Sequence, residues 1–209
     1  MKSNSLLRTL IVSASVFLVL APQTGCMTVQ RGDTVVKNFS DKQVFNGKKI
    51  AALPVKIQTA LATDSVQGLR QEVNKRLGQV TKARLPNSTV LDVATVAEEL
   101  NQKNLLPAYE QFIATYDNTG VLDRKQIQAM AKGLGSDYLL FTRLKAEKMD
   151  IIITRGFGAS VDTMLVDVRT GEVTWSGTGE WKRGGIYGFG ETKLDEAAGR
   201  LLDLAFASL

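Results

Sequence analysis

The stretch Asp137-Tyr-Leu-Leu-Phe-Thr-Arg-Leu144 marks the point at which the apolar pattern of the chain changes from a helical period to an alternating one. This pattern predicts a strand. Two further strands are expected at about residues 159–169 and 172–181, and Arg169-Thr-Gly171 between them has the composition of a tight hairpin turn. The second half of the chain is therefore predicted to form a meander.

The half of the chain that precedes this stretch alternates short strands with helices. Short apolar runs predict two strands, at residues 49–55 and 88–91. Helices are expected to follow three capping residues, Asp64, Asp92 and Asp123, and two more are expected over 107–116 and 192–209. The order β-α-β-α-α-α-β-β-β-α predicts an α/β fold, with one mixed β-sheet flanked by helices in a single domain.

The composition restricts the chemistry available to the chain. Its 209 residues include no histidine and one cysteine, and 26 basic against 21 acidic residues give a net charge of +5. The lack of histidine removes imidazole bases, serine–histidine and cysteine–histidine nucleophile pairs and histidine-ligated metals. One cysteine excludes an intrachain disulfide and multi-cysteine metal sites. We therefore expect one globular domain without a metal or a cofactor.

The first 25 residues are typical of an export signal. Lys2 and Arg8 are the charged residues before Cys26, and residues 9–21 are almost wholly apolar. About 13 apolar residues suit the core of a signal peptide, whereas a membrane-spanning helix needs about 20. Removal of the signal would also remove two positive charges, which weakens any inference of nucleic-acid binding from the net charge.

The lone cysteine follows this segment and resembles the lipobox of bacterial lipoproteins. Thr24 and Gly25 precede Cys26, as small residues do in the lipobox, while Gln23 stands where the family has an aliphatic residue. The resemblance implies that Cys26 becomes the new N-terminus and carries acyl chains, palmitate among them, that bind membrane lipid. Met27 behind it implies sorting to the outer membrane, facing the periplasm. The alternative is an unmodified cysteine.

These features divide the chain into three parts. Residues 1–25 are expected to be the lipoprotein signal peptide, 26–47 a lipid-anchored tether and 48–209 the α/β globular domain. Residues 27–46 are polar and show no apolar period. A flexible tether of about 20 residues spans roughly 25 Å, so the domain is expected near the bilayer.

Three segments of the expected domain resemble a pattern of bacterial envelope lipoproteins. They are Lys49–Val55, Ala131–Leu140 and Leu165–Gly177, in this order. The group includes the CsgG-like secretion lipoproteins and the LpoB-like activators of peptidoglycan synthases. The resemblance implies a fold like the N-terminal domain of TolB and a non-catalytic role through contacts with envelope proteins or self-assembly. Each segment also has a structural interpretation, with Asp167 in a hairpin turn and Trp175 packed on a sheet face.

A glycine-rich stretch near the C-terminus is the candidate contact loop. It reads Gly184-Gly-Ile-Tyr-Gly-Phe-Gly190 and follows Lys182 and Arg183. Exposed apolar groups on a glycine-rich backbone mark interfaces, and the candidate contact residues are Ile186, Tyr187 and Phe189. The alternatives are a loop without a binding role and a nucleotide site, although the stretch lacks the strand-to-helix context that a nucleotide site requires.

The sequence does not favour catalysis. Glu98 and Glu99 are adjacent on a helix and do not face each other. Asp162 and Asp167 differ by an odd number on one strand, so they lie on opposite faces and cannot act as an acid–base pair. No basic patch is interleaved with aromatic residues, so a nucleic-acid partner is not expected.

We therefore predict a non-enzymatic outer-membrane lipoprotein that acts as an accessory or assembly factor in envelope biogenesis or secretion. Its partners would be envelope proteins and membrane lipid, and a homo-oligomer is possible. One alternative is a ring-forming secretion-channel subunit of the CsgG type, although residues 145–160 and 181–193 are short for the pore hairpins of that group. The other is a periplasmic ligand-binding or hydrolytic domain.

Overall fold

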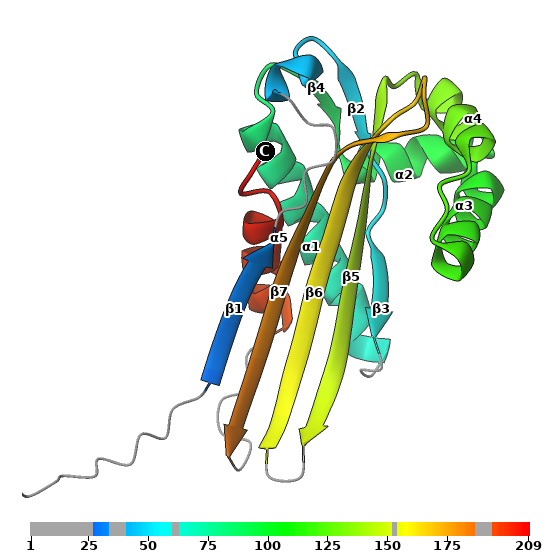
Figure 1. Cartoon of the computed structure of the whole chain (residues 1–209). Helices are drawn as coiled ribbons and strands as arrows, with labels where there is room; N and C mark the ends of the chain where they lie inside the picture. Colours follow the sequence, from blue (N-terminus) through cyan, green and yellow to red (C-terminus); the bar gives the residue numbers. More distant parts are fainter. Residues whose placement is uncertain (1–26, 34–40, 60–62, 152–153, 187–193) are drawn as a thin grey trace, which may run out of the picture.

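The computed structural model describes residues 27–33, 41–59, 63–151, 154–186 and 194–209 (Figure 1). The strands are β1 (Met27–Asp33), β2 (Lys49–Ala52), β3 (Lys56–Thr59), β4 (Thr89–Leu91), β5 (Tyr138–Ile151), β6 (Thr154–Asp167) and β7 (Val173–Ile186). The helices are a 3₁₀ turn (Lys42–Phe45), α1 (Thr63–Arg84), α2 (Val93–Gln102), α3 (Leu106–Thr119), α4 (Arg124–Leu134) and α5 (Leu194–Ala205). Within these residues, no helix is both long enough and apolar enough to cross a membrane.

The strands form one mixed sheet, as the sequence predicts. Its order is β1-β7-β6-β5-β2-β4, and β3 pairs with β5 beside this path. The β5–β6–β7 meander and β1 are antiparallel, whereas β2 pairs in parallel with β4 and β5, and β3 in parallel with β5. The α/β fold class is thereby confirmed.

Helices cover both faces of the sheet and enclose two apolar cores. On one face, α1 and α5 pack on Leu140, Leu165 and Trp175, all of which are buried. On the other face, α2, α3 and α4 pack on residues of the opposite parity, such as Leu139 and Phe141. Alternating residues of one strand thus enter different cores, as the two-residue period of a strand requires. Figure 1 shows that α2, α3 and α4 lie towards the upper end of the long strands.

Two glycines of β7 let α5 lie directly on the strand. A Cβ atom at Gly177 would collide with the carbonyl oxygen of Ala205, and one at Gly179 would collide with that of Leu201. Beside them, the indole nitrogen of Trp175 donates to Ser208 Oγ at 3.1 Å, and its ring centroid lies 5.2 Å from that of Phe206. Trp175 is therefore a core residue, in agreement with its structural interpretation.

Two of the three predicted caps and the turn occur where the sequence places them, whereas Asp64 lies inside α1, which begins at Thr63. Asp92 accepts a hydrogen bond from the amide of Thr95 at 3.0 Å, and Asp123 caps α4 in the same way. In the hairpin between β6 and β7, Asp167 Oδ1 accepts from the amide of Arg169 at 2.7 Å. Gly171 has φ +75°, which favours glycine.

Within the segment predicted as a tether, 26–47, the structure describes two elements. Residues 27–33 form β1, which pairs antiparallel with β7 from Met27 opposite Gly184 to Asp33 opposite Thr178. Nearer the domain, Phe45 is fully buried and its ring lies 5.0 Å from that of Tyr138. An edge strand needs no apolar period when its pairing is supplied by a neighbouring strand, which explains why the sequence pattern did not reveal it.

Two further elements differ from the sequence-based prediction. β3 follows Pro54 and was not predicted, because its four residues are half-buried and mixed in polarity. The meander strands also run further than expected, so that β5 ends at Ile151 and β7 at Ile186. The predicted contact loop therefore begins within a strand.

Candidate interaction surfaces

The sequence-predicted site residues lie at or beyond the limits of the described chain. Ile186 is the last residue of β7, and its backbone pairs with Thr154 of β6. Cys26, Tyr187 and Phe189 lie outside the described residues. Both the lipid-attachment site and the contact loop stay predictions.

A network of charged groups lies where α3 meets the meander. Arg143 of β5 has its guanidinium Nη2 3.1 Å from Asp162 Oδ2 of β6 and Nη1 3.9 Å from Asp117 Oδ1 of α3. Its guanidinium carbon lies 5.6 Å from the ring centroid of Tyr116. Lys56 of β3 reaches the same Asp117 at 3.6 Å. This network joins α3 and three strands at one point.

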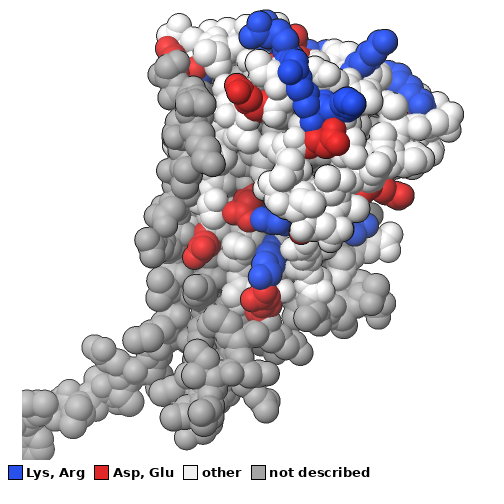
Figure 2. Space-filling model, turned by 45° about the vertical axis from the view of Figure 1, so that its right-hand side comes forward, with Lys and Arg blue, Asp and Glu red and all other residues white. Residues whose placement is uncertain are grey.

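The network is partly open to solvent. It lies where the helices on this face of the sheet end. The Arg143 side chain is 27% exposed and that of Asp162 is 36% exposed. Thr178 of β7 also donates to Asp162, at 3.1 Å. Figure 2 shows acidic and basic side chains next to one another on this side of the molecule. Because the charges are mutually paired, the arrangement stabilises the packing of α3 and presents a polar surface of mixed sign.

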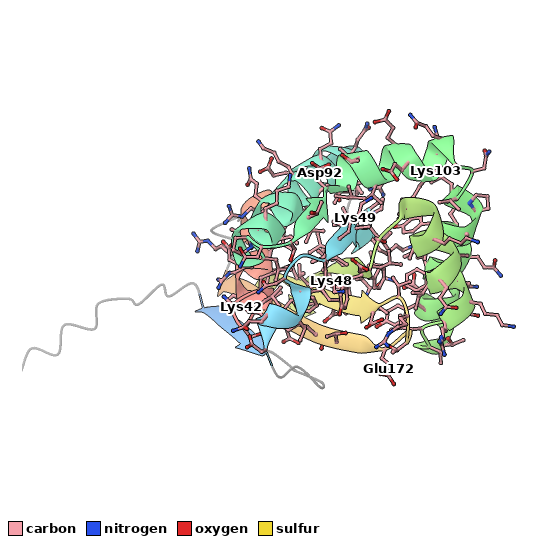
Figure 3. All side chains as sticks on the ribbon, turned by 90° about the horizontal axis from the view of Figure 1, so that it is seen from above. Lys42, Lys48, Lys49, Asp92, Lys103 and Glu172 are labelled. Atoms are coloured by element: carbon pink, nitrogen blue, oxygen red, sulfur yellow. The ribbon has the colours of Figure 1, made fainter. Side chains whose placement is uncertain are left out.

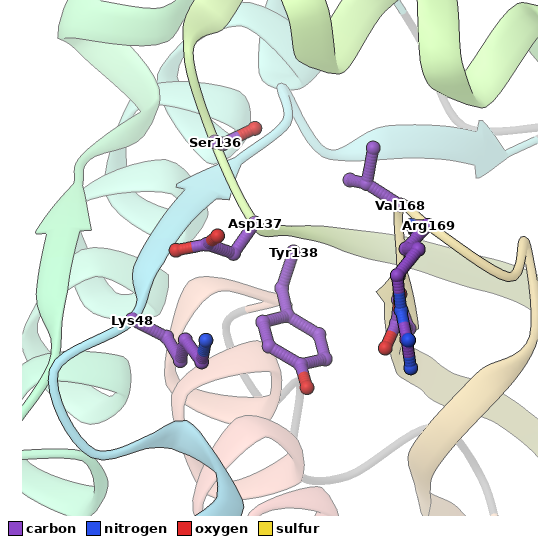
Figure 4. A pocket seen from close by; sticks show the side chains of 7 residues that line it. Lys48, Ser136, Asp137, Tyr138, Val168 and Arg169 are labelled. Atoms are coloured by element: carbon purple, nitrogen blue, oxygen red, sulfur yellow. Dashed lines mark hydrogen bonds between the residues drawn. The ribbon is translucent and has the colours of Figure 1, made fainter.

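A shallow cleft lies at the upper end of the sheet. Its volume is about 220 Å³, and residues from three separate segments line it: Lys48, Ser136, Asp137, Tyr138, Asp167, Val168 and Arg169. In Figure 4, Lys48 and Arg169 lie on either side of Tyr138. The sequence analysis did not identify this cleft, because no single segment contains its lining.

The acidic side chains of the cleft accept hydrogen bonds from backbone amides. Asp137 Oδ2 accepts from the amide of Lys49 at 2.9 Å, and Asp167 Oδ1 accepts from the amides of Arg169 and Thr170. Burial raises the pKa of Tyr138, and the negative charges of Asp167 and Asp137 raise it further. The phenol therefore stays protonated near neutral pH.

These groups do not form a recognisable catalytic arrangement. A general base must lie within hydrogen-bond reach of the group that it activates. Both carboxylates of the cleft instead accept hydrogen bonds from backbone amides, Asp137 from Lys49 and Asp167 from Arg169. Among the described residues, no group of histidine, cysteine, aspartate and glutamate side chains is placed to hold a metal ion.

The upper end of the molecule carries charged side chains of both signs. Figure 3, which views the molecule from this end, labels six of them, spread across the view: Lys42, Lys48, Lys49, Asp92, Lys103 and Glu172. Lys49 Nζ donates a hydrogen bond to the carbonyl oxygen of Leu134, and Lys103 Nζ donates one to that of Gly133. The upper end is therefore a polar surface of both signs.

Comparison with known proteins gives matches among solved structures. No family model and no curated protein matches the chain. The lipoprotein GNA1162 from Neisseria meningitidis aligns at 17% identity and a TM-score of 0.46, over 72% of this chain and 91% of that one. The PelC dodecamer from Paraburkholderia phytofirmans aligns at 14% and 0.45, over 86% and 98%. The LpoB C-terminal domain from Escherichia coli aligns at 17% and 0.37, over 65% and 83%.

These matches include proteins of the kind that the sequence resembles. GNA1162 is a bacterial lipoprotein, and LpoB gives its name to one branch of the predicted group. LpoB and GNA1162 are therefore among the solved structures to which this chain is similar. At these identities and TM-scores, the likeness says nothing of what the chain does.

Proposed function

We propose that this protein is an outer-membrane lipoprotein, acylated at Cys26, that acts without catalysis as an accessory or assembly factor for other proteins of the cell envelope. The signal-like residues 1–25 and the small residues before Cys26 support the anchor. The protein-binding role is supported by a polar upper end whose cleft has both carboxylates engaged with the backbone.

One observation carries this proposal. Met27, the residue directly after Cys26, is already paired with Gly184 in the sheet. An acylated Cys26 would therefore join the lipid to the folded domain without an intervening tether. The domain would be held at the membrane surface rather than suspended some distance from it.

An acyl anchor at Cys26 would determine which end of the domain faces the membrane. The described chain begins at the lower end of the sheet in Figure 1, and the cleft lies at the upper end. A strand rises about 3.3 Å per residue, so the 14 residues of β6 span roughly 45 Å. The cleft and α2, α3 and α4 would then face the periplasm at about this distance from the lipid.

The mechanism that follows is docking at high local concentration. An anchored domain meets other envelope proteins within a thin layer, so that contacts too weak for free solution become sufficient. The mixed charges of the upper end would select partners of complementary pattern and influence how fast they associate.

Crosslinking in cells tests the docking role. A photo-reactive amino acid at Lys48 or Arg169 should capture specific envelope proteins, because both residues line the cleft. The same amino acid at Gln71, an exposed residue of α1, serves as the matched control. Identical capture from all three positions, or none at the cleft, would contradict docking through the upper end.

A further inference from the structure

Three side chains of the cleft at the upper end carry hydrogen-bond donors without an acceptor in the part of the chain that the structure describes. They are the ammonium group of Lys48, the guanidinium group of Arg169 and the hydroxyl of Tyr138. In Figure 4, the Tyr138 hydroxyl points between the side chains of Lys48 and Arg169. Tyr138 is only 8% exposed, so its hydroxyl is the polar end of a buried side chain that lines the cleft.

The backbone and the ring that carry these donors are held in place by contacts within the chain. The amide of Lys48 donates to the carbonyl of Phe45 at 3.0 Å, and the ring of Phe45 packs edge-on against that of Tyr138. On the other side of the cleft, the carbonyl oxygen of Arg169 accepts from Arg124 Nη2 at 2.7 Å. Donors mounted on fixed elements lose less conformational freedom when they bind, so the cleft is preorganised for a ligand.

The two carboxylates of the cleft are engaged with the backbone instead of with these cations. Asp167 Oδ1 accepts from two amides, at 2.7 and 3.2 Å, and Asp137 Oδ2 accepts from the amide of Lys49 at 2.9 Å. Within the described residues, neither carboxylate forms an ion pair with Lys48 or Arg169. Both cations therefore remain open to a group from outside the chain.

The size and the donors of the cleft fit a carboxylate on another protein. The volume is about 220 Å³, whereas sites for whole small molecules have about 300–1,000 Å³, so the cleft accommodates a side chain or a chain end. Guanidinium and ammonium groups form charge-assisted hydrogen bonds with carboxylates. Because Asp137 and Asp167 line the same cleft, a singly charged group meets less repulsion there than a doubly charged phosphate.

We infer that this cleft binds a carboxylate of a partner protein, held by Lys48, Arg169 and the hydroxyl of Tyr138. The inference rests on the proposed function, because it gives the chemistry of the group that docks at the upper end. The carboxylate belongs to an acidic side chain or to a C-terminus, since both present the same planar group. Each contact alone is weak at an exposed site, and membrane anchoring of the domain makes such contacts sufficient.

Fluorescence polarisation with labelled peptides tests this inference on the full-length protein, extracted from membranes in an uncharged detergent. The probes are an amidated peptide of glycine and glutamate, the same peptide with glutamine for glutamate, and this glutamine peptide with a free C-terminal carboxylate. At low salt, at least one of the two carboxylate peptides should bind about tenfold more tightly than the amidated glutamine peptide. Which of them does so identifies the source of the carboxylate.

Two variants separate the cleft from general attraction between charges. Lys48→Gln/Arg169→Gln should weaken binding of the carboxylate peptide about tenfold, and Tyr138→Phe, which keeps the buried ring, about threefold. The matched control Lys125→Gln/Lys132→Gln removes the same charge from exposed positions of α4 and should bind like the parent. Circular dichroism should give the same folded spectrum for all variants.

Equal binding of the three peptides, binding of none, or equal weakening by the two double variants would overturn the inference. The docking role is tested separately, by photo-crosslinking from Lys48 and Arg169 in cells. Capture of specific envelope proteins together with equal binding of the three peptides would overturn the carboxylate specificity and leave the docking role in place.

Discussion

Met27 of β1 and Gly184 of β7 are directly opposed in the antiparallel ladder that forms one edge of the sheet. The pairing joins the first described residue of the chain to a residue 157 positions later. It makes β1 a strand of the sheet, directly after the predicted lipid-attachment residue Cys26 in the sequence.

Disulfide trapping tests the register of β1. Thr28 is opposite Arg183, and antiparallel partners lie about 4.5–5.5 Å apart between Cα atoms, within the range of a disulfide. In a Cys26→Ser background, Thr28→Cys/Arg183→Cys should therefore oxidise to a form that migrates faster on a non-reducing gel. Thr28→Cys/Lys182→Cys is the matched control, because a shift of one residue places the second cysteine on the opposite face. Equally efficient bridging in both variants would indicate a mobile segment.

The close approach of α5 to β7 predicts that alanine substitutions at two glycines have opposite effects on stability. Gly179→Ala would drive a Cβ atom into the carbonyl of Leu201, so we expect the free energy of unfolding to fall by about 2–3 kcal/mol. Gly68→Ala lies within α1 with open space around it and should raise that free energy by about 0.5–1 kcal/mol. Urea unfolding of both variants measures these changes, and a neutral Gly179→Ala would contradict the packing of α5.

Arg143 of β5 joins α3 to the sheet through Asp117 and Tyr116, and it also pairs with Asp162 of the neighbouring strand β6. Replacing it with methionine should lower the free energy of unfolding by about 1–2 kcal/mol, since the partners are only partly shielded from water. The control is Lys145→Met on the same strand, where the side chain is 53% exposed and pairs with Glu147. That variant should change stability by less than about 0.5 kcal/mol. Equal effects would show that Arg143 has no special role.

The raised pKa of Tyr109 predicts that the protein loses stability at alkaline pH. Its hydroxyl donates to the carbonyl of Pro54 at 2.8 Å, and burial raises its pKa to about 12 from the ordinary 10.0. The folded state thus favours the protonated phenol. The contribution of Tyr109 to the free energy of unfolding is therefore complete below about pH 10 and is lost as the pH rises towards 12. A shift of this size corresponds to about 2–3 kcal/mol.

Urea unfolding at successive pH values between 10 and 12 tests this prediction. The parent should lose stability more steeply than Tyr109→Phe, which has no phenol to ionise at that position. Parallel curves for the two proteins would contradict the shifted pKa of Tyr109.

The parts of the fold that depend on local chemistry could be predicted from the sequence. Asp92 and Asp123 cap helices, and Asp167 and Gly171 form the hairpin, because each acts on residues within a few positions of itself. The change to an alternating pattern at Asp137 located the meander for the same reason.

The parts that depend on distant partners could not be predicted in this way. β1 is polar and gains its structure from β7, and β3 is a short half-buried strand beside β5. The cleft and the Arg143 network join segments that are far apart in sequence, so neither leaves a local motif. The alternative of a ring-forming subunit also depends on distant surfaces, and the mass of the detergent-solubilised protein would decide it.

Mass spectrometry of the N-terminal peptide from the membrane-extracted native protein tests the central claim most directly. We expect a mature chain that begins at Cys26, with the mass of a diacylglyceryl group and an amide-linked acyl chain added to it. The Cys26→Ala variant should lose this modification and leave the membrane fraction. A native N-terminus at another residue, or an unmodified Cys26, would contradict the account.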